Sequence, residues 1–431
     1  MTRKTRFCAV LALVLLAACG EEQVILPGER LDLRASAAQV NEARPINLPV
    51  ARVNADWTHR NGGPTHQISH PALGASLAPA FVADIGQGDS RRARITADPV
   101  VAGGVVYTLD ARAQVTATTT SGQQLWSVDL TPRRANPAAA SGGGLAAGGG
   151  QLFVTTGFGE VSAIDSATGR VAWVQRLDAP AIAAPTVVGD LVYVVARDSV
   201  GWALDVTNGR IRWQQTGTPS TANFASGAAP AVNDSIAIFP FPSGEVVATF
   251  PAGGLQRWSS VISGERLGRA ISLITDIGGD PVIDGARVYV GNFGGRTVAL
   301  DLLNGDRIWT ASEGAVGPVW PVGDAVFLIN DLNELLRLDA ANGAVVWRVA
   351  LPRFADGRTA RQRSVFAHRG PVLAGGRLIV ASSDGVIRQF DPASGGLIGT
   401  LDLPGGAASS PVVAGQTLYV VSKTGQLHAF R

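Results

Sequence analysis

The amino-acid sequence predicts an all-β protein, an eight-bladed β-propeller built from four-stranded antiparallel blades. The first observation is a repeat that opens with Pro and a Val-rich run, crosses a Gly/Asp turn into an aromatic strand, and ends Ala-Leu-Asp-x-x-x-Gly-x-x-x-Trp. The second is the spacing of its marker position from Trp126 to Gly399, 38 to 52 residues, which fits four short strands per unit. The third is the alternation of Val, Ile and Tyr runs with Gly and Asn-Gly turns, without the apolar spacing of a helix.

The repeats account for most of the chain, and the clearest copies span residues 185–213 and 281–309. A seventh copy carries Gly399 where the Trp should be, and an eighth begins at Pro411 and stops at Arg431, before its last strand. Because a large aromatic residue at one place in each blade can bury against its neighbour, we expect the marker residues to dock one blade on the next. They are Trp126, Trp173, Trp213, Trp258, Trp309 and Trp347.

The incomplete eighth copy predicts how the ring closes. A blade that lacks one strand would leave an open sheet edge, which is an aggregation hazard. The segment near Asp56 and Trp57 lies ahead of the first full blade and holds a Trp that no repeat explains. We expect this N-terminal segment to supply the outer strand of the last blade. The alternative is a tail without regular structure that contains a stray Trp.

Residues 1–18 have the pattern of a secretory leader. Three basic residues precede an apolar core from Phe7 to Leu16, which is too short to span a bilayer as a mature helix. The sequence Leu-Ala-Ala-Cys-Gly that follows resembles a bacterial lipoprotein box, which implies cleavage before Cys19 and lipidation of that residue. The alternative is a plain signal peptide followed by a coincidental Cys.

This reading of the N-terminus sets the expected domain limits. Residues 19–55 show little periodicity and several Pro and charged residues, so we expect a lipidated N-terminus and flexible tether there, followed by the propeller over residues 56–431. By resemblance to lipoprotein sorting, Gly20 after the Cys favours the outer membrane. Two or more acyl chains on Cys19 would anchor the protein stably, where one chain would not.

Cysteine count and charge exclude several classes of function. The only cysteines are Cys8, inside the leader, and Cys19, so we expect no disulfide in the ring. The net charge is +2, and without residues 1–18 the chain has 33 basic and 34 acidic residues, a net charge of −1. This balance gives no indication of a nucleic-acid partner.

The residues that could form a metal, phosphate or catalytic site have ordinary structural explanations. His66 and His70 are four residues apart, which on a helix could chelate a metal, but nearby Gly and Pro residues argue against a helix. No catalytic motif stands out, so we expect no metal site, no cofactor and no catalytic residues. The Gly-rich run over 141–150 lacks the Gly-Lys-Ser/Thr ending of a phosphate loop.

Arginine is the unusual charge signal. Apart from Lys423, every basic residue after the leader is Arg, with clusters at Arg91, Arg92 and Arg94 and over residues 353–369. The second cluster contains Arg353, Arg358, Arg361, Arg363 and Arg369. Arg suits protein interfaces because its planar fork makes bidentate contacts. A genome rich in G and C would also favour Arg over Lys, so both explanations stay open.

Together, the lipoprotein box, the tether and the Trp-marked repeat resemble the BamB family, the lipoprotein propellers of the β-barrel assembly machinery (the BAM complex). The repeat is similar to the PQQ-like motif of quinoprotein dehydrogenases. The resemblance covers residues 56–431 and, in kind, the leader. It implies a non-enzymatic scaffold, lipid-anchored to the periplasmic face of the outer membrane, that binds the POTRA domains of BamA. It also implies a role in assembling and inserting outer-membrane β-barrel proteins, with unfolded outer-membrane proteins as further candidate partners.

The resemblance also implies a partner surface on the loops that precede the middle blades. There Phe224 keeps an apolar side chain, while Ala225 departs from the family's Arg. In the next loop Asp276 matches the family pattern, and Gly278 departs from its second Asp.

Two other functions compete with this one. A PQQ-dependent dehydrogenase would need a Ca²⁺ site and usually an adjacent Cys pair, which this chain lacks. A lipoprotein scaffold for a different envelope partner would use the same ring, because function resides in loops grafted on the fold.

Overall fold

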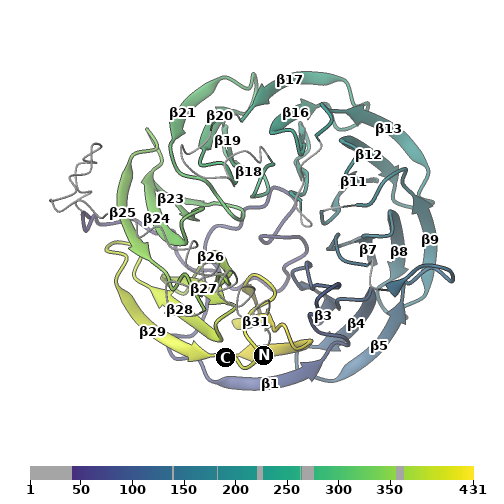
Figure 1. Cartoon of the computed structure of the whole chain (residues 1–431), viewed down its shortest axis with the longest axis horizontal. Coiled ribbons are helices and arrows are strands. Elements are labelled where there is room, and N and C mark those ends of the chain that lie inside the picture. Colours follow the sequence, from purple (N-terminus) through teal and green to yellow (C-terminus); the bar gives the residue numbers. More distant parts are fainter. Residues whose placement is uncertain are drawn as a thin grey trace, which may run out of the picture. The chain divides into compact units, whose positions relative to one another are not determined.

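The structure, a computed structural model, describes residues 41–137, 140–181, 183–220, 227–262, 264, 276–355 and 364–431. Their strands form eight four-stranded sheets, each a simple antiparallel meander, arranged as the blades of a ring (Figure 1). The prediction of an eight-bladed β-propeller is therefore confirmed. No helix among these residues is long and apolar enough to cross a membrane.

The blades are numbered here in chain order, and within each the strands run from the ring centre outward. Blades 1 to 4 consist of β2 (Val100–Ala102), β3 (Val105–Leu109), β4 (Gln114–Thr119) and β5 (Gln124–Asp129); β6 (Leu145–Gly148), β7 (Gln151–Thr156), β8 (Glu160–Asp165) and β9 (Val171–Arg176); β10 (Thr186–Val188), β11 (Leu191–Val195), β12 (Val200–Asp205) and β13 (Ile211–Thr216); and β14 (Ala231–Val232), β15 (Ala237–Pro240), β16 (Glu245–Thr249) and β17 (Gln256–Val261).

Blades 5 to 8 follow the same order. They consist of β18 (Val282–Asp284), β19 (Arg287–Gly291), β20 (Thr297–Asp301) and β21 (Arg307–Ala311); β22 (Trp320–Val322), β23 (Ala325–Ile329), β24 (Glu334–Asp339) and β25 (Val345–Ala350); β26 (His368–Ala374), β27 (Arg377–Ser382), β28 (Val386–Phe390) and β29 (Leu397–Asp402); and β30 (Val412–Ala414), β31 (Thr417–Val421), β32 (Gln426–Phe430) and β1 (Pro79–Asp84).

The sequence pattern of each strand matches its place in the blade. Second strands such as β11 and β23 are Val- and Leu-rich and buried along their whole length, because both of their faces pack against neighbouring blades. Outer strands such as β13 alternate exposed and half-buried residues, since one face points to solvent. The core of the ring thus lies in the middle two strands of every blade.

The marker tryptophans lie at the blade interfaces. Trp213 of blade 3, for example, donates its indole N–H to the Pro251 carbonyl of blade 4 at 3.0 Å. Its ring lies over Gly254, whose φ is +71° and where a Cβ would approach the indole to 2.5 Å. The same pairing of indole and turn glycine recurs for Trp126 and Gly169, Trp173 and Gly209, Trp258 and Gly305, Trp309 and Gly343, and Trp347 and Gly395.

Blade 8 is completed by an N-terminal strand, as expected, but the strand is not the one near Trp57. Strand β1 pairs with β32, with Val82 opposite His428. Phe81 of β1 takes the place of the missing marker: it lies opposite Ala429, and its ring covers Gly122 of blade 1, where a Cβ would come within 2.8 Å. The predicted closure by an N-terminal strand is confirmed, but its predicted position near Trp57 is wrong. An outer strand with one face in solvent requires alternating exposed and half-buried residues, which β1 has, and it does not require a Trp.

Closure at β1 also explains Gly399. Each marker tryptophan covers the turn between the last two strands of the next blade. In blade 8 that turn does not exist, because β32 ends at the C-terminus and β1 comes from the other end of the chain. Blade 7 therefore has no turn glycine to cover.

The segment that contains Trp57 instead fills the centre of the ring, and we call residues 54–72 the plug (Figure 1). It exchanges hydrogen bonds with the innermost strand, or the turn that follows it, of seven blades. These bonds join Asn54 to Gly415, Trp57 to Val101, Thr58 to Ala147, His59 to Val187, Pro64 to Val232, Thr65 to Ile283, and Pro71 to Gly375. The remaining blade, blade 6, contributes Trp320, whose ring stacks on Trp57 at 6.3 Å between centroids.

Part of the expected tether also contacts the ring. Asn41 hydrogen-bonds the backbone of Arg348 in β25, and Arg44 forms an ion pair with Asp339 at 2.8 Å. Arg337, whose side chain is fully buried, donates to the carbonyl groups of Arg44 and Pro45. Residues 41–55 therefore lie along the propeller, and residues 19–40 of the expected tether lie outside the described part of the chain.

Candidate functional site

The propeller has two unlike faces, which the meander of each blade separates. One, which we call the turn face, carries the tight turns after the first and third strands of each blade. The other, the loop face, carries the turns between the second and third strands and all the interblade loops, which are the longest connections in the ring. Long loops on a rigid scaffold are where binding residues concentrate, so the loop face is the candidate functional site.

The two residues predicted to bind a partner belong to the chain segments that connect blade 3 to blade 4 and blade 4 to blade 5. Phe224, ahead of blade 4, falls outside the described residues. Asp276, ahead of blade 5, is only 2% exposed. Its backbone carbonyl accepts a hydrogen bond from Phe293, and the next residue, Ile277, pairs with Asn292. The structure thus places the Asp276 side chain inside the base of its loop and not on the open surface.

The departure at Gly278 has a steric cause. A Cβ at this position would lie 2.2 Å from the carbonyl oxygen of Ala315, far inside van der Waals contact. The second Asp of the family pattern cannot occupy this backbone position. Glycine at this position therefore fits the close packing of this backbone against Ala315.

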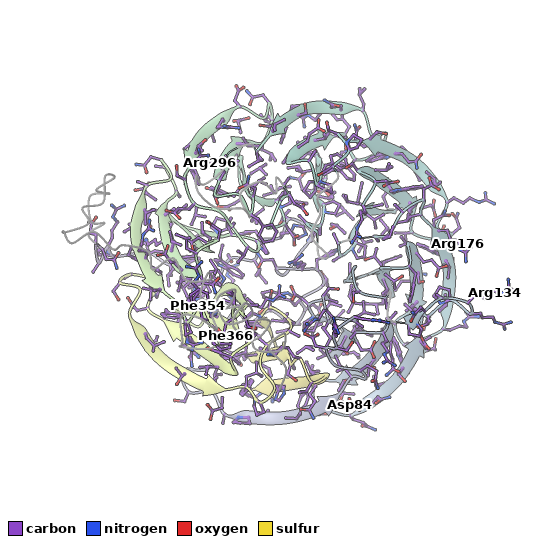
Figure 2. The ribbon with its side chains drawn as sticks, in the orientation of Figure 1. Asp84, Arg134, Arg176, Arg296, Phe354 and Phe366 are labelled. Atoms are coloured by element: carbon purple, nitrogen blue, oxygen red, sulfur yellow. The ribbon has the colours of Figure 1, made fainter. Side chains whose placement is uncertain are left out.

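The Arg-rich segment 353–369 leaves the ring between blades 6 and 7. The described stem of this loop is a short hairpin in which Phe354 pairs with Val365, and Phe366 donates its backbone N–H to the carbonyl of Arg353 (Figure 2). The Arg353 guanidinium lies over the Phe354 ring at 5.0 Å, and Val365 is 55% exposed. Arg358, Arg361 and Arg363 lie outside the described residues.

The other Arg residues singled out in the sequence have different surroundings. Arg91 and Arg92 are exposed, whereas Arg94 pairs with Asp89 at 3.1 Å. Arg369 lies at the ring centre, where burial lowers its pKa and the Asp98 carboxylate opposes that shift. Arg369 is therefore a half-buried residue of β26, the innermost strand of blade 7, and is not part of the exposed hairpin stem at Phe354 and Val365.

A charged cluster joins the plug to the inner ends of several blades. Arg60 of the plug contacts Asp98 at 3.4 Å, ahead of blade 1, and Asp280 at 3.2 Å, ahead of blade 5. Burial opposes the charge on Arg60, but the two carboxylates outweigh it and raise its pKa. Asp98 also accepts the backbone N–H of Ser410, and Asp280 that of Ala229.

The histidines of the plug are engaged by backbone groups. His59 accepts the N–H of Val187 through Nε2, so this nitrogen carries no proton, and burial lowers its pKa to about 3. Burial also lowers the pKa of His66, whose Nδ1 contacts the Pro281 carbonyl at 2.9 Å. His70 bridges Pro49 and Gly376. Within the described ranges, no three His, Cys, Asp or Glu side chains are placed to hold a metal ion.

Sequence reasoning missed Phe81 and the plug for definable reasons. The signal for Phe81 is an alternating strand with an aromatic residue, which is weaker than a Trp-marked repeat. The signal for the plug is the concentration of His59, His66 and His70 within twelve residues. No local pattern distinguishes a segment that pairs with the ends of several blades from an ordinary loop.

Comparison with known proteins identifies relatives along most of the ring. The family model described as outer membrane protein assembly factor BamB matches residues 111–349 and 347–431. BamB of Yersinia pestis is 25% identical over 341 residues, 77% of this chain and 83% of the relative. BamB of Escherichia coli strain K12 is 24% identical over 340 residues, with the same coverage of 77% and 83%.

Solved structures show the same fold. The crystal structure of BamB from Moraxella catarrhalis superposes with a TM-score of 0.69 at 17% identity, covering 83% of this chain and 100% of that one. A quinohemoprotein alcohol dehydrogenase from Comamonas testosteroni reaches 0.65 at 15% identity, covering 88% and 81%. These similarities establish the architecture alone. Because the BamB family model extends from the turn before β4 to the C-terminus, the chain belongs to the BamB family of outer membrane protein assembly factors.

Proposed function

We propose that the protein is a non-enzymatic scaffold of the β-barrel assembly machinery that binds the POTRA domains of BamA and assists the assembly and insertion of outer-membrane β-barrel proteins. The observation that carries this proposal is the BamB family match over residues 111–431. In this proposal BamA binds the loop face at the interblade loops ahead of blades 4 and 5. Phe224 supplies an apolar contact, and the buried Asp276 shapes its loop.

The plug supports a role without catalysis. The central channel is where a propeller has room for a ligand, and here the chain's own residues occupy it. Trp57 is 1% exposed and His66 is 0% exposed, and both are bonded to surrounding blades. A small molecule on the ring axis would have to displace these residues.

Lipidation of Cys19 completes the proposal. Lipid on this residue would hold the protein on the periplasmic face of the outer membrane, because two or more acyl chains anchor a protein stably. In Cys19→Ser, we expect the protein to lose partitioning into the detergent phase of Triton X-114. Partitioning equal to that of the unaltered protein would contradict the anchor.

Capture of BamA tests the partner. The full-length protein, tagged at its C-terminus and solubilised from membranes, should co-purify BamA. Phe224→Glu places a charge in a contact that loses water, so it should reduce capture at least about tenfold, equivalent to about 1.4 kcal/mol. The melting temperature should stay within a few degrees of the unaltered protein.

The matched control is Leu303→Glu, the same apolar-to-acidic change at a residue that is 64% exposed on the turn face. Capture should be unchanged in this variant. Should Phe224→Glu retain BamA as well as Leu303→Glu does, the surface lies elsewhere on the loop face, and the Arg-rich segment 353–369 is the next to test. A co-purified envelope protein other than BamA would favour the alternative scaffold.

A further inference from the structure

A cleft of about 610 Å³ opens on the loop face at blade 2, two blades away from the loops proposed to bind BamA. It lies between the interblade loop after β5 and the end of β9, beside the turn between β7 and β8. We propose that this cleft is a second docking site, which takes an acidic, extended peptide segment of a partner protein. The residues that carry the argument are Pro132, Arg133, Arg134, Phe158, Arg176 and Leu177.

The cleft has a preformed apolar floor. Phe158 packs against the core between blades 1 and 2, and Leu177 is only 8% exposed and donates its N–H to the Gly159 carbonyl at 2.8 Å. The loop with Pro132 is fixed on the other side, where Leu130 donates to the carbonyl of Ala113 at 3.0 Å. Because these groups are already in place, binding would cost little ordering of the chain.

The walls of the cleft are positively charged. Arg176 has a side chain that is 79% exposed, and its Nε lies 3.1 Å from Glu160, so this pair is locally neutral. Arg133 and Arg134 are exposed and form no ion pair with any residue in the described ranges. Arg134 and Arg176 both lie at the outer rim of the ring (Figure 2). The cleft therefore carries two uncompensated guanidinium groups above an apolar floor.

The positive charge and the apolar floor together indicate which kind of peptide the cleft would bind. Guanidinium forks bind carboxylates bidentately, so the walls favour Asp and Glu side chains. The apolar floor favours a Leu or Phe between the acidic residues, since buried apolar anchors carry most of the energy of an interface. The volume suits a few residues of extended chain rather than a folded domain. A membrane surface would require a flatter and more extensive basic patch, because each Lys or Arg contributes little on its own.

Fluorescence anisotropy with the full-length protein and a short fluorescein-labelled peptide, in which Asp and Glu alternate with Leu and Phe, tests the proposal. The acidic peptide should bind at least about tenfold more tightly than a peptide with Lys in place of Asp and Glu, and binding should weaken as NaCl rises from about 0.05 M to about 0.5 M. The double variant Arg133→Glu/Arg134→Glu should reduce the affinity at least about tenfold. A photoreactive version of the peptide should cross-link to the loop of residues 131–137 or to residues 157–160.

The matched control is Arg170→Glu/Arg210→Glu, which makes the same change in net charge at exposed residues of the turn face. It should bind the peptide within about twofold of the unaltered protein. Equal losses in both double variants would reduce the effect to net charge and overturn the proposal. So would cross-links confined to other blades, a basic peptide that binds equally well, or binding to vesicles of anionic phospholipid without binding to the peptide.

Discussion

The indole of each marker tryptophan makes a polar and an apolar contact with the next blade. Its N–H satisfies a backbone carbonyl there, as Trp173 does for Val206 at 2.9 Å, while its ring covers a glycine with a positive φ, as at Gly209. A side chain at that glycine would collide with the ring. The Trp of one blade and the Gly of the next are therefore both needed for the same interblade contact.

Loss of one indole should therefore weaken a blade interface. We expect Trp213→Ala to lower the free energy of unfolding by about 3 kcal/mol, because it removes buried aromatic surface and the indole hydrogen bond to Pro251, whose carbonyl keeps only the longer bond from the Tyr193 hydroxyl at 3.4 Å. Urea unfolding measures this change. Ile211→Ala is the control on the same strand, since Ile211 is 46% exposed, and should cost less than about 1 kcal/mol. A Trp213→Ala protein that keeps its stability but loses BamA capture would make Trp213 an interface residue.

The plug histidines make stability depend on pH. His59 has a folded-state pKa of about 3, below its ordinary value of 6.5, because it is buried and lies close to His66. Between these values the unfolded chain binds a proton that the folded chain does not. The contribution of His59 to the free energy of unfolding is therefore highest above pH 6.5 and decreases as the pH falls below this value. Burial lowers the pKa of His66 too, so His66 acts in the same direction.

Unfolding in urea at about pH 7.5 and about pH 5 should reveal this linkage. Each histidine that stays neutral in the folded state changes the free energy of unfolding by about 1.4 kcal/mol per pH unit below its unfolded pKa. His59 alone should therefore lower the free energy of unfolding by about 2 kcal/mol at about pH 5. His59→Gln preserves an acceptor for Val187 without titrating, and it should remove that part of the slope. An unchanged slope in His59→Gln would contradict the assignment.

At the scale of single elements, β1 is the strand on which ring closure depends. It is far in sequence from the rest of its blade, yet Phe81 reproduces the docking contact of a marker tryptophan, with Tyr419 beside it at 6.4 Å. Without β1, the edge of β32 would be exposed and free to pair with other chains.

Shortening Phe81 should loosen this closure. Phe81→Ala is expected to cost about 3 kcal/mol and to make the last blade more sensitive to proteolysis near β32. Val82→Ala, one residue along and 53% exposed, is the control and should change little. Differential scanning fluorimetry and limited proteolysis measure the two effects. Equal melting temperatures for the two variants would show that Phe81 does not hold the ring closed.

The elements also show where sequence reasoning succeeds and where it stops. Blade number, strand order and marker residues were predictable because each is encoded within one repeat. The identity of β1 and the path of Trp57 were not, because both depend on partners in other repeats. The partners of the plug include both Val101 and Val413, to which Asn54 donates 359 residues further along. The burial of Asp276 was also hidden, since it follows from contacts at the base of its loop.

For the whole molecule, the plug connects blades that do not touch one another. Through Arg60, the region ahead of blade 1 is joined to the region ahead of blade 5, on the opposite side of the ring. The Asp280 side chain is fully buried, and this contact places a guanidinium beside its carboxylate.

Arg60→Met should therefore destabilise the entire ring. Removing one partner of a buried ion pair leaves an uncompensated charge, with an expected cost of about 3–5 kcal/mol measured by chemical unfolding. Combining it with Asp280→Asn should recover part of that loss. Arg52→Met removes an exposed Arg just ahead of the plug and should be nearly neutral. If Arg60→Met behaves like Arg52→Met, the cluster contributes nothing to ring stability.

The pairing of β1 with β32 has a consequence for folding kinetics. A chain that is synthesised from its N-terminus presents β1 and the plug before the other blades, but the partners of β1 include Phe430 in the distant strand β32. Contacts of such high sequence separation slow folding, since the ends must meet before the contacts form. Strand β1 therefore has no strand partner until β32 has been synthesised. During this interval the unpaired N-terminal segment is exposed to aggregation, and the interval grows with the number of residues between β1 and β32. A chaperone that binds the segment up to and including β1 would therefore reduce aggregation more than one that binds any single blade.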